Sequence, residues 1–214
     1  MVSDTLHVDV LSDVVCPWCL IACRRLELAA ERLGSEASVD FELHPFLLDP
    51  SVPPEGSDLR DHLRRKFGDP EPMFRRIEKL AREDGIDLDF ERIRRFSSTV
   101  RAHTLIRAAR EKGTQWQLGR AIFAAYFVEG RDIADLGVLC GLASSHGFSA
   151  DEARTLLSDR DALATTLLAA RAASERGIRG VPFIMFMDGR AISGAQSVEV
   201  FEKALRDARP PEAS

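Results

Sequence analysis

Three cysteines near the start of the chain are the residues whose type and spacing best suit chemistry. Segment 14–25 has the sequence VVCPWCLIACRR, with cysteines at positions 16, 19 and 23 and a proline directly after the first. Cysteines this close together can bind a metal, form a structural disulfide or exchange disulfides with a substrate. The sequence around them has to distinguish these three uses.

The first two cysteines lie where a predicted strand is followed by a predicted helix. Segment 6–11 (LHVDVL) is short, apolar and β-branched, which indicates a strand, and apolar residues recur at helical spacing from Pro17 to about Leu33. Proline is favoured at the first helical position, so Cys16 is expected to be the N-cap. The free N–H groups and the helix dipole stabilise an anion there, which makes Cys16 a nucleophilic thiolate. We expect Cys16 to be the accessible thiol, and Cys19 a sheltered thiol that resolves a mixed disulfide.

The composition indicates a globular protein with one domain, or one domain that carries an insertion. The chain has 214 residues, 45% of them hydrophobic, and a net charge of −5 with the two signs intermixed. No basic stripe indicates nucleic-acid binding. The start of the chain has neither the basic region nor the apolar region of a signal peptide, and no apolar run approaches the roughly 18 residues of a membrane span. The expected compartment is the cytoplasm, where structural disulfides are rare.

A zinc site is the main alternative use of these cysteines. A closed structural site needs four cysteine or histidine ligands, usually as two spaced pairs. The three clustered cysteines would need a distant fourth ligand such as His44, His62 or Cys140, and no second C-x2-C pair occurs. We therefore predict no metal. Cys23 and Cys140 are expected to be small buried hydrophobic residues, which is how free cysteines generally behave.

The rest of the sequence divides into a β-rich beginning, a helical middle and a β-rich end. Segment 38–46 alternates apolar and polar residues, as in a strand, and segment 49–57 is a linker with three prolines. Strand character returns at 181–187, where a turn at Asp188-Gly189 leads to a hairpin partner at 190–193, and a helix is expected over 198–208. Between these parts we predict helices at 58–67, 71–84, 89–95, 99–112, 115–129, 135–146, 150–157 and 160–176.

Without the helical middle, the element order is β-α-β followed by β-β-α. This order predicts an α/β protein with a thioredoxin fold that carries a large α-helical insertion. The predicted boundaries are 1–48 for the first half of the thioredoxin-like domain, 49–177 for the insertion and 178–214 for the second half.

Two separated motifs carry a family resemblance. The sequence SDVVCPWC at 12–19, followed by GVPFIMFMDGRAISGAQ at 180–196, resembles the DsbA family of thiol-disulfide oxidoreductases, and more closely its FrnE-like branch. The resemblance implies that Cys16 is the nucleophile, that Cys19 is the resolving thiol, and that Val181-Pro182 is a cis peptide facing them. A substrate peptide would then pair with Val181 as an added strand.

Two departures from the family pattern affect the chemistry. DsbA has a histidine between its cysteines, whereas Trp18 is uncharged, so we expect a lower reduction potential. Together with Pro17, Trp18 is a candidate substrate contact, although it would equally serve to shield the pair from water. Thioredoxin-like proteins often bury a carboxylate at the place occupied here by Val10. The proton acceptor for Cys19 is therefore left open between Asp13 and water.

Two other functions remain as alternatives. Kappa-class glutathione transferases and 2-hydroxychromene-2-carboxylate isomerases resemble this architecture, but a serine takes the place of Cys16 and activates glutathione. The intact cysteine pair favours dithiol exchange over that function, and also over a redox-inert adaptor. We expect no bound cofactor, with glutathione or another low-molecular-weight thiol as a candidate reductant. The expected partner is a disulfide-containing protein or small molecule, while its identity, the direction of exchange and the oligomeric state stay open.

Overall fold

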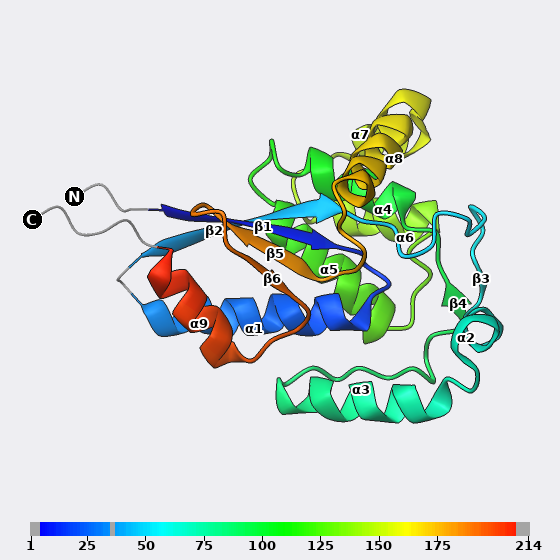
Figure 1. Cartoon of the computed structure of the whole chain (residues 1–214). Coiled ribbons are helices and arrows are strands. Elements are labelled where there is room, and N and C mark those ends of the chain that lie inside the picture. The colour runs from blue at the N-terminus through cyan, green and yellow to red at the C-terminus, as the bar shows by residue number, and fades with distance from the viewer. Residues whose placement is uncertain (1–4, 35–36, 209–214) are drawn as a thin grey trace, which may run out of the picture.

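The computed structural model describes residues 5–34 and 37–208 (Figure 1). Strands and helices form close to where the hydrophobic periodicity predicts them. In chain order the elements are β1 (Thr5–Ser12), α1 (Pro17–Leu33), β2 (Ser38–Pro45), β3 (Ser57–Asp58), α2 (Leu59–Phe67), α3 (Glu71–Glu83), β4 (Arg95–Phe96), α4 (Val100–Ala108), α5 (Gln115–Phe127), α6 (Leu136–Ser144), α7 (Ala150–Ser158), α8 (Arg160–Glu175), β5 (Phe183–Phe186), β6 (Ala191–Ser193) and α9 (Val198–Asp207).

The main sheet brings the two ends of the chain together. Its strand order is β2-β1-β5-β6, with β1 parallel to β2, and with β5 antiparallel to both β1 and β6. In this register Leu11 pairs with Phe183. Because β5 runs antiparallel to β1, the start of β5 lies beside the end of β1. The segment that precedes β5 is therefore brought next to the loop that carries Cys16.

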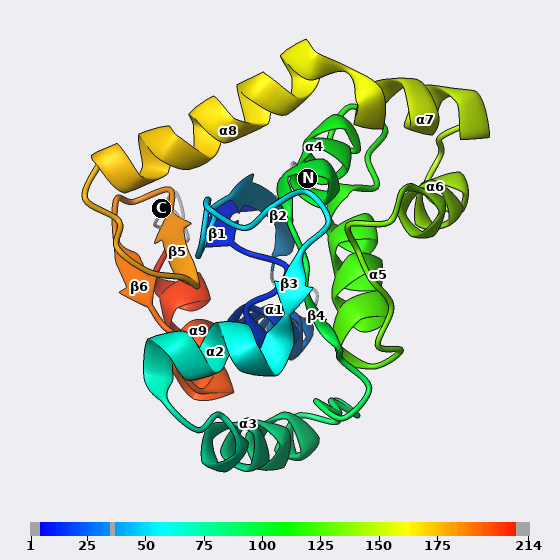
Figure 2. The same ribbon diagram turned by 90° about the vertical axis from the view of Figure 1, so that its right-hand side faces the viewer.

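Helices cover both faces of this sheet (Figures 1 and 2). On one face, α1 and α9 pack beside each other against the side chains of Leu6, Val8 and Val10, which are at most 3% exposed. On the other face lie α4 and α8, and α5 lies along the β2 edge of the sheet, where it contacts both β2 and α1. The alternation of buried and exposed residues along β1 follows from its two-residue period, because only alternate side chains face α1.

The segment between β2 and β5 is mainly helical. It contains α2 to α8 and a short antiparallel pair of strands, β3 and β4. Figures 1 and 2 place α2 and α3 beyond and beside the N-terminal end of α1. The structure joins a β-α-β unit and a β-β-α unit in one sheet, with helices inserted between them. This arrangement confirms the predicted fold class. Across the described part of the chain, no helix combines the length and the apolar character needed to cross a bilayer.

One predicted helix, 89–95, is wrong. Phe90, Ile93 and Phe96 are buried at a spacing of three, which resembles helical periodicity, but the backbone forms turns and then β4. The Glu78 carboxylate accepts a hydrogen bond from the Phe90 N–H at 2.9 Å, and β4 pairs with β3. These long-range contacts replace the local hydrogen bonds of a helix. By contrast, the capping box that Ser149 and Glu152 predict at the start of α7 is confirmed.

Candidate active site

The first two cysteines lie at the N-terminal end of α1, at the edge of the sheet where β1 ends (Figure 1). Cys16 is the N-cap, with extended backbone angles of φ −92° and ψ 112°, and Pro17 is the first helical residue. The Cys16 N–H donates to the Asp13 carbonyl at 2.9 Å, which closes a tight turn before the helix. The backbone N–H of Cys19 donates to the Cys16 carbonyl at 3.0 Å. The predicted cap position of Cys16 is therefore confirmed.

Both cysteines are enclosed by protein. Cys19 is fully buried, as expected, but Cys16 is only 3% exposed, so the prediction that it would be accessible is wrong for this structure. Burial raises the pKa of the Cys19 thiol well above its usual value, and the hydrogen bond and charge of Cys16 raise it further. Cys19 therefore holds its proton strongly in the reduced pair.

The segment before β5 contacts the Cys16 sulfur. The Val181-Pro182 peptide bond is cis, the form that the resemblance implied. The Cys16 S–H donates to the Val181 carbonyl oxygen at 3.7 Å, Val181 is half-buried and Pro182 is buried. The antiparallel pairing of β5 with β1 produces this contact, and it helps to explain why Cys16 is enclosed.

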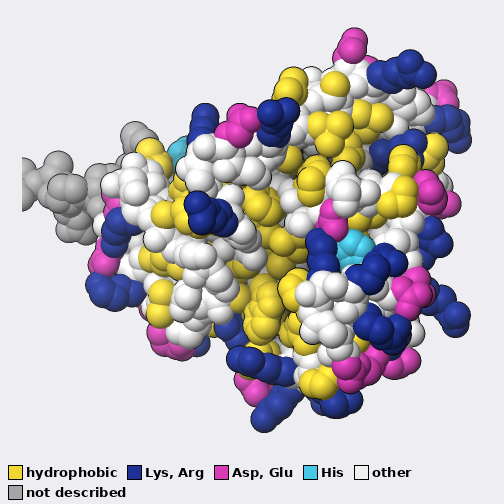
Figure 3. All heavy atoms as spheres, turned by 45° about the vertical axis from the view of Figure 1, so that its right-hand side comes forward, with side chains coloured by type: hydrophobic (Ala, Val, Ile, Leu, Met, Phe, Trp, Pro, Cys, Tyr) yellow, Lys and Arg dark blue, Asp and Glu magenta, His cyan; other side chains and the backbone are white. Residues whose placement is uncertain are grey.

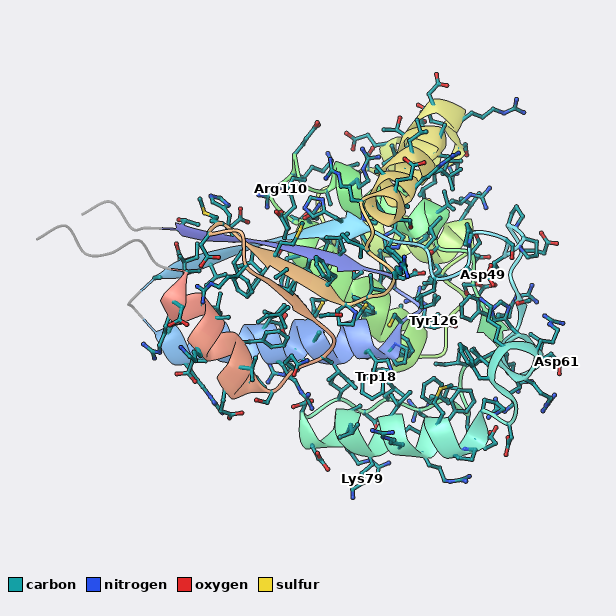
Figure 4. The ribbon with its side chains drawn as sticks, in the orientation of Figure 1. Trp18, Asp49, Asp61, Lys79, Arg110 and Tyr126 are labelled. Carbon is teal, nitrogen blue, oxygen red and sulfur yellow. The ribbon has the colours of Figure 1, made fainter. Side chains whose placement is uncertain are left out.

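Pro17 and Trp18, the other residues predicted to contact substrate, are both half-buried. Trp18 lies on the side of α1 that faces α3 (Figure 4) and packs against the hydrophobic core. Figure 3 shows the face toward which the N-terminal end of α1 points. Hydrophobic side chains gather in its middle, and lysine, arginine, aspartate and glutamate surround them. A surface of this kind suits contact with an extended peptide.

The other two cysteines lie outside this pair. Cys23 is fully buried in the core, as predicted, and its burial raises its pKa to about 12, with smaller effects from Arg120 and Glu27. Cys140, on α6, is half-buried, so the prediction that it would be buried is wrong. All four cysteines are free thiols.

The structure adds a residue that the sequence analysis missed. His103, on α4, is 2% exposed, and its Nε2 lies 3.4 Å from Oδ1 of Asp13, which is 1% exposed. The other carboxylate oxygen of Asp13 accepts a hydrogen bond from the Leu48 N–H at 2.8 Å. The available signal was a histidine within the apolar stretch 102–106, on the face of a helix that must be buried.

The described side chains also bear on the zinc alternative. Among them, one group lies close enough together to share a metal ion. It consists of Asp9, Glu42 and His44 and contains no cysteine. His44 is hydrogen-bonded to Asp9 at 2.8 Å, and His62 stacks on Phe96 at a ring-centroid distance of 4.1 Å. Both candidate histidine ligands therefore have partners away from the cysteine pair.

Comparison with known proteins identifies the family. The model of the DSBA-like thioredoxin domain matches residues 7–206, nearly the whole chain. This chain belongs to the DSBA-like thioredoxin domain family. Members of the family are disulfide oxidoreductases and isomerases, and this chain is such an enzyme. A curated relative is the uncharacterized protein YwbO of Bacillus subtilis, which is 28% identical over 95% of this chain and 97% of its own length.

Solved structures of the family have the same architecture. The probable DsbA oxidoreductase SCO1869 of Streptomyces coelicolor is 28% identical, with a TM-score of 0.85 over 98% of this chain and 93% of its own. Two neighbours share the fold at lower identity. A 2-hydroxychromene-2-carboxylate isomerase is 19% identical, with a TM-score of 0.72 over 94% and 95% of the two chains. The cytosolic disulfide reductase DsbM of Pseudomonas aeruginosa, determined with GSH, is 20% identical, with a TM-score of 0.65 over 94% and 98%.

Proposed function

We propose that this enzyme exchanges disulfides through the Cys-Pro-Trp-Cys pair, with Cys16 as the nucleophile and Cys19 as the resolving thiol. The observation that carries the proposal is the position of Cys16 at the N-cap of α1. Free N–H groups and the helix dipole at that position favour a thiolate. Cys19 is fully buried and holds its proton strongly, which suits a thiol that acts second.

The reaction takes place in two steps. The Cys16 thiolate attacks one sulfur of the substrate disulfide, so that a mixed disulfide forms and the other substrate sulfur leaves as a thiolate. Cys19 then loses its proton and attacks Cys16, which releases the second substrate thiolate and leaves a Cys16–Cys19 disulfide. The same steps in reverse oxidise a substrate dithiol, so the residues alone support reductase, oxidase and isomerase directions.

Substrate binding is assigned to the segment beside the cysteines. The Val181 carbonyl lies against Cys16, so a peptide that pairs with this segment as an added strand brings its disulfide to the nucleophile. Trp18 and Pro17 border the same site, and Pro182 closes it from the β5 side. We assign the chain to the FrnE-like branch on the motifs at 12–19 and 180–196, and a cytoplasmic location remains a prediction.

Glutathione is the proposed reductant. Two glutathione thiols reduce the Cys16–Cys19 disulfide and leave as one glutathione disulfide, which balances the two electrons. The structure of DsbM with GSH supports this class of reductant.

A glutathione-dependent transferase or isomerase is the alternative function, suggested by the fold shared with 2-hydroxychromene-2-carboxylate isomerase. That function would use a single thiol or hydroxyl and would not need Cys19.

The test is insulin reduction with glutathione as the electron donor, together with trapping in cells. The wild-type protein is expected to reduce insulin, and Cys16→Ser to lose this activity. Cys19→Ser is expected to accumulate mixed disulfides through Cys16, from which the bound partners are identified by mass spectrometry. No insulin reduction by the wild-type protein, together with no partner trapped by Cys19→Ser, would favour the glutathione-dependent alternative.

A further inference from the structure

A buried carboxylate and a buried imidazole face each other directly behind the cysteine turn. Asp13 is 1% exposed and His103 is 2% exposed, and their side chains approach to 3.4 Å. Removing two ionisable groups from water destabilises the folded protein for each charge that they carry. The fold does not need this pair in order to join the insertion to the sheet, because α4, α5 and α8 already pack against β2.

Asp13 is connected to both cysteines through its backbone. Its carbonyl accepts the Cys16 N–H at 2.9 Å, and its backbone hydrogen-bonds to the Cys19 thiol, where it favours the thiolate and lowers the pKa. His103 reaches Asp13 from α4, and Leu48, in the segment after β2, holds the second carboxylate oxygen. The carboxylate is thus fixed between the helical insertion and the turn that carries the reacting sulfurs.

The resolving step requires a proton acceptor. Cys19 must lose its proton before it can attack the mixed disulfide, yet it is fully buried and out of contact with bulk water. Two other titratable groups in the described core hold their own protons tightly. Burial raises the pKa of Tyr126 far above its usual value, with the charge of Asp13 as the next cause, and burial raises the pKa of Cys23 to about 12.

We infer that the Asp13–His103 pair takes up the proton that Cys19 releases. As the Cys19 sulfur attacks Cys16, its proton moves to the pair, the bond between Cys16 and the substrate sulfur breaks, and that sulfur leaves as a thiolate. When the Cys16–Cys19 disulfide is reduced, the pair returns the proton to the Cys19 thiolate. This assignment rests on the proposed function of the two cysteines.

The partnership with His103 makes Asp13 suitable for this role. The hydrogen bond to the imidazole and the Leu48 N–H compensate a carboxylate charge that burial alone would disfavour. A proton that arrives is shared between the carboxylate and the imidazole, so it need not reach solvent during the step. Within the described residues, the Asp13 backbone contacts both cysteines, and Tyr126 on α5 lies close enough for the charge of Asp13 to raise its pKa.

The two chemical steps are separable with 5,5′-dithiobis(2-nitrobenzoate). Cys16 attacks the reagent and releases one nitrothiobenzoate, and Cys19 then expels the second, so stopped-flow absorbance records two phases. All proteins carry Cys140→Ser, because that thiol is half-buried and would add its own signal. The variants are Asp13→Asn and His103→Gln, each compared with the reduced parent across about pH 6 to 9.

The chain offers a matched pair of controls. His62 and Asp49 also lie 3.4 Å apart with side chains no more than 10% exposed. The other hydrogen bonds and ion pairs that the described structure gives their side chains go to Ser51, Ser57 and Lys66, and not to the cysteine turn. Asp49→Asn and His62→Gln therefore make the same chemical changes and leave the acceptor in place. We expect both controls to retain the rate and pH profile of each phase within about twofold.

Asp13→Asn and His103→Gln are expected to keep the rate of the first phase within about twofold of the parent. They should slow the second phase by about tenfold or more, because general base catalysis typically accelerates a step by at least that factor. The slowing should be greatest at low pH and diminish as hydroxide takes over. An unchanged second phase, or slowing by the same factor at every pH, would overturn the inference. Should Asp13→Asn fail to fold, His103→Gln decides the result. Loss of the second phase in the parent protein would instead contradict the proposed function.

Discussion

The Sγ atom of Cys16 lies 3.7 Å from the carbonyl oxygen of Val181, although 165 positions separate the two residues in the sequence. The contact joins the β-α-β unit at the start of the chain to the β-β-α unit at its end. It arises because β5 runs antiparallel to β1, with Leu11 opposite Phe183. The nucleophile and the segment proposed to bind substrate therefore depend on one sheet register, and not on the helices inserted between them.

Cys23 is expected to be structural. Cys23→Ser should keep insulin reduction within about twofold and lower the free energy of unfolding by roughly 1–3 kcal/mol, because it places a hydroxyl in a fully buried site. Cys140→Ser, at a half-buried site, is the control and should cost less. Urea denaturation and turnover measure both quantities. A tenfold loss of turnover in Cys23→Ser would instead indicate a site of three cysteines.

The buried resolving thiol should resist alkylation. In folded Cys16→Ser, the remaining thiols are Cys19 and Cys23, both fully buried with raised pKa values, and the half-buried Cys140. Iodoacetamide requires a thiolate, so near neutral pH we expect modification of Cys140 alone, and of all three thiols after denaturation. Mass spectrometry of the digest identifies the modified residues. Rapid labelling of Cys19 in the folded variant would show that it is neither sheltered nor strongly protonated.

Asp49 is expected to stabilise the protein except in strong acid. Burial alone would raise its pKa, but hydrogen bonds from Lys66 and Ser51 lower it to about 2. The ordinary pKa is about 3.9, so the contribution is fully present above about pH 4 and is lost as the pH falls toward 2. Asp49→Asn should lower the free energy of unfolding by about 2 kcal/mol at neutral pH and by much less near pH 2, as measured by urea denaturation.

Asp61→Asn is the control for that measurement. Asp61 forms an exposed ion pair with Arg64, and exposed pairs contribute little. Both positions are labelled in Figure 4, and they differ in burial, with side chains 10% exposed for Asp49 and 63% for Asp61. An equal loss of stability in the two variants at neutral pH would contradict the account of Asp49.

Gly130 is required where the chain leaves α5. Its φ is +68°, and a Cβ atom there would lie 2.4 Å from the carbonyl oxygen of Arg92. Gly113 has the same φ of +68° but open space around it. Gly113→Ala should therefore lower the free energy of unfolding by about 1–2 kcal/mol, because alanine is strained in the left-handed backbone conformation. Gly130→Ala should lower it by about 1–3 kcal/mol more, because its Cβ atom also collides with the backbone. Thermal denaturation compares the two, and equal losses would contradict the steric argument.

Much of the site followed from local sequence signals. Pro17 after Cys16 indicated the start of a helix. The alternating segment 38–46 and the apolar segments 6–11 and 181–187 indicated three strands of the main sheet. The false helix over 89–95 arose because Phe90, Ile93 and Phe96 repeat a helical spacing, whereas their segment is held by β3 and by Glu78. Contacts of that kind join residues far apart in the chain, and periodicity contains no information about them.

The pairing of Asp13 with His103 was unpredictable for the same reason. Asp13 was a candidate, because it lies in the loop before Cys16. Nothing in the sequence indicated that His103, 90 positions away, would meet it. The burial of Cys16 was missed as well, because a helix N-terminus suggests exposure and the enclosing Val181 carbonyl comes from the other end of the chain. Local rules locate the nucleophile, whereas tertiary packing determines what surrounds it.

A redox titration tests the central claim most directly. The protein is equilibrated with glutathione buffers of graded ratio, quenched with acid, alkylated and digested, and its disulfides are identified by mass spectrometry. We predict a single disulfide, between Cys16 and Cys19. Its midpoint should lie on the order of −270 to −180 mV, the span from thioredoxin to disulfide isomerase, because Trp18 adds no positive charge to stabilise the reduced form. A different disulfide, or glutathione bound with no Cys16–Cys19 bond at any ratio, would contradict dithiol exchange through this pair.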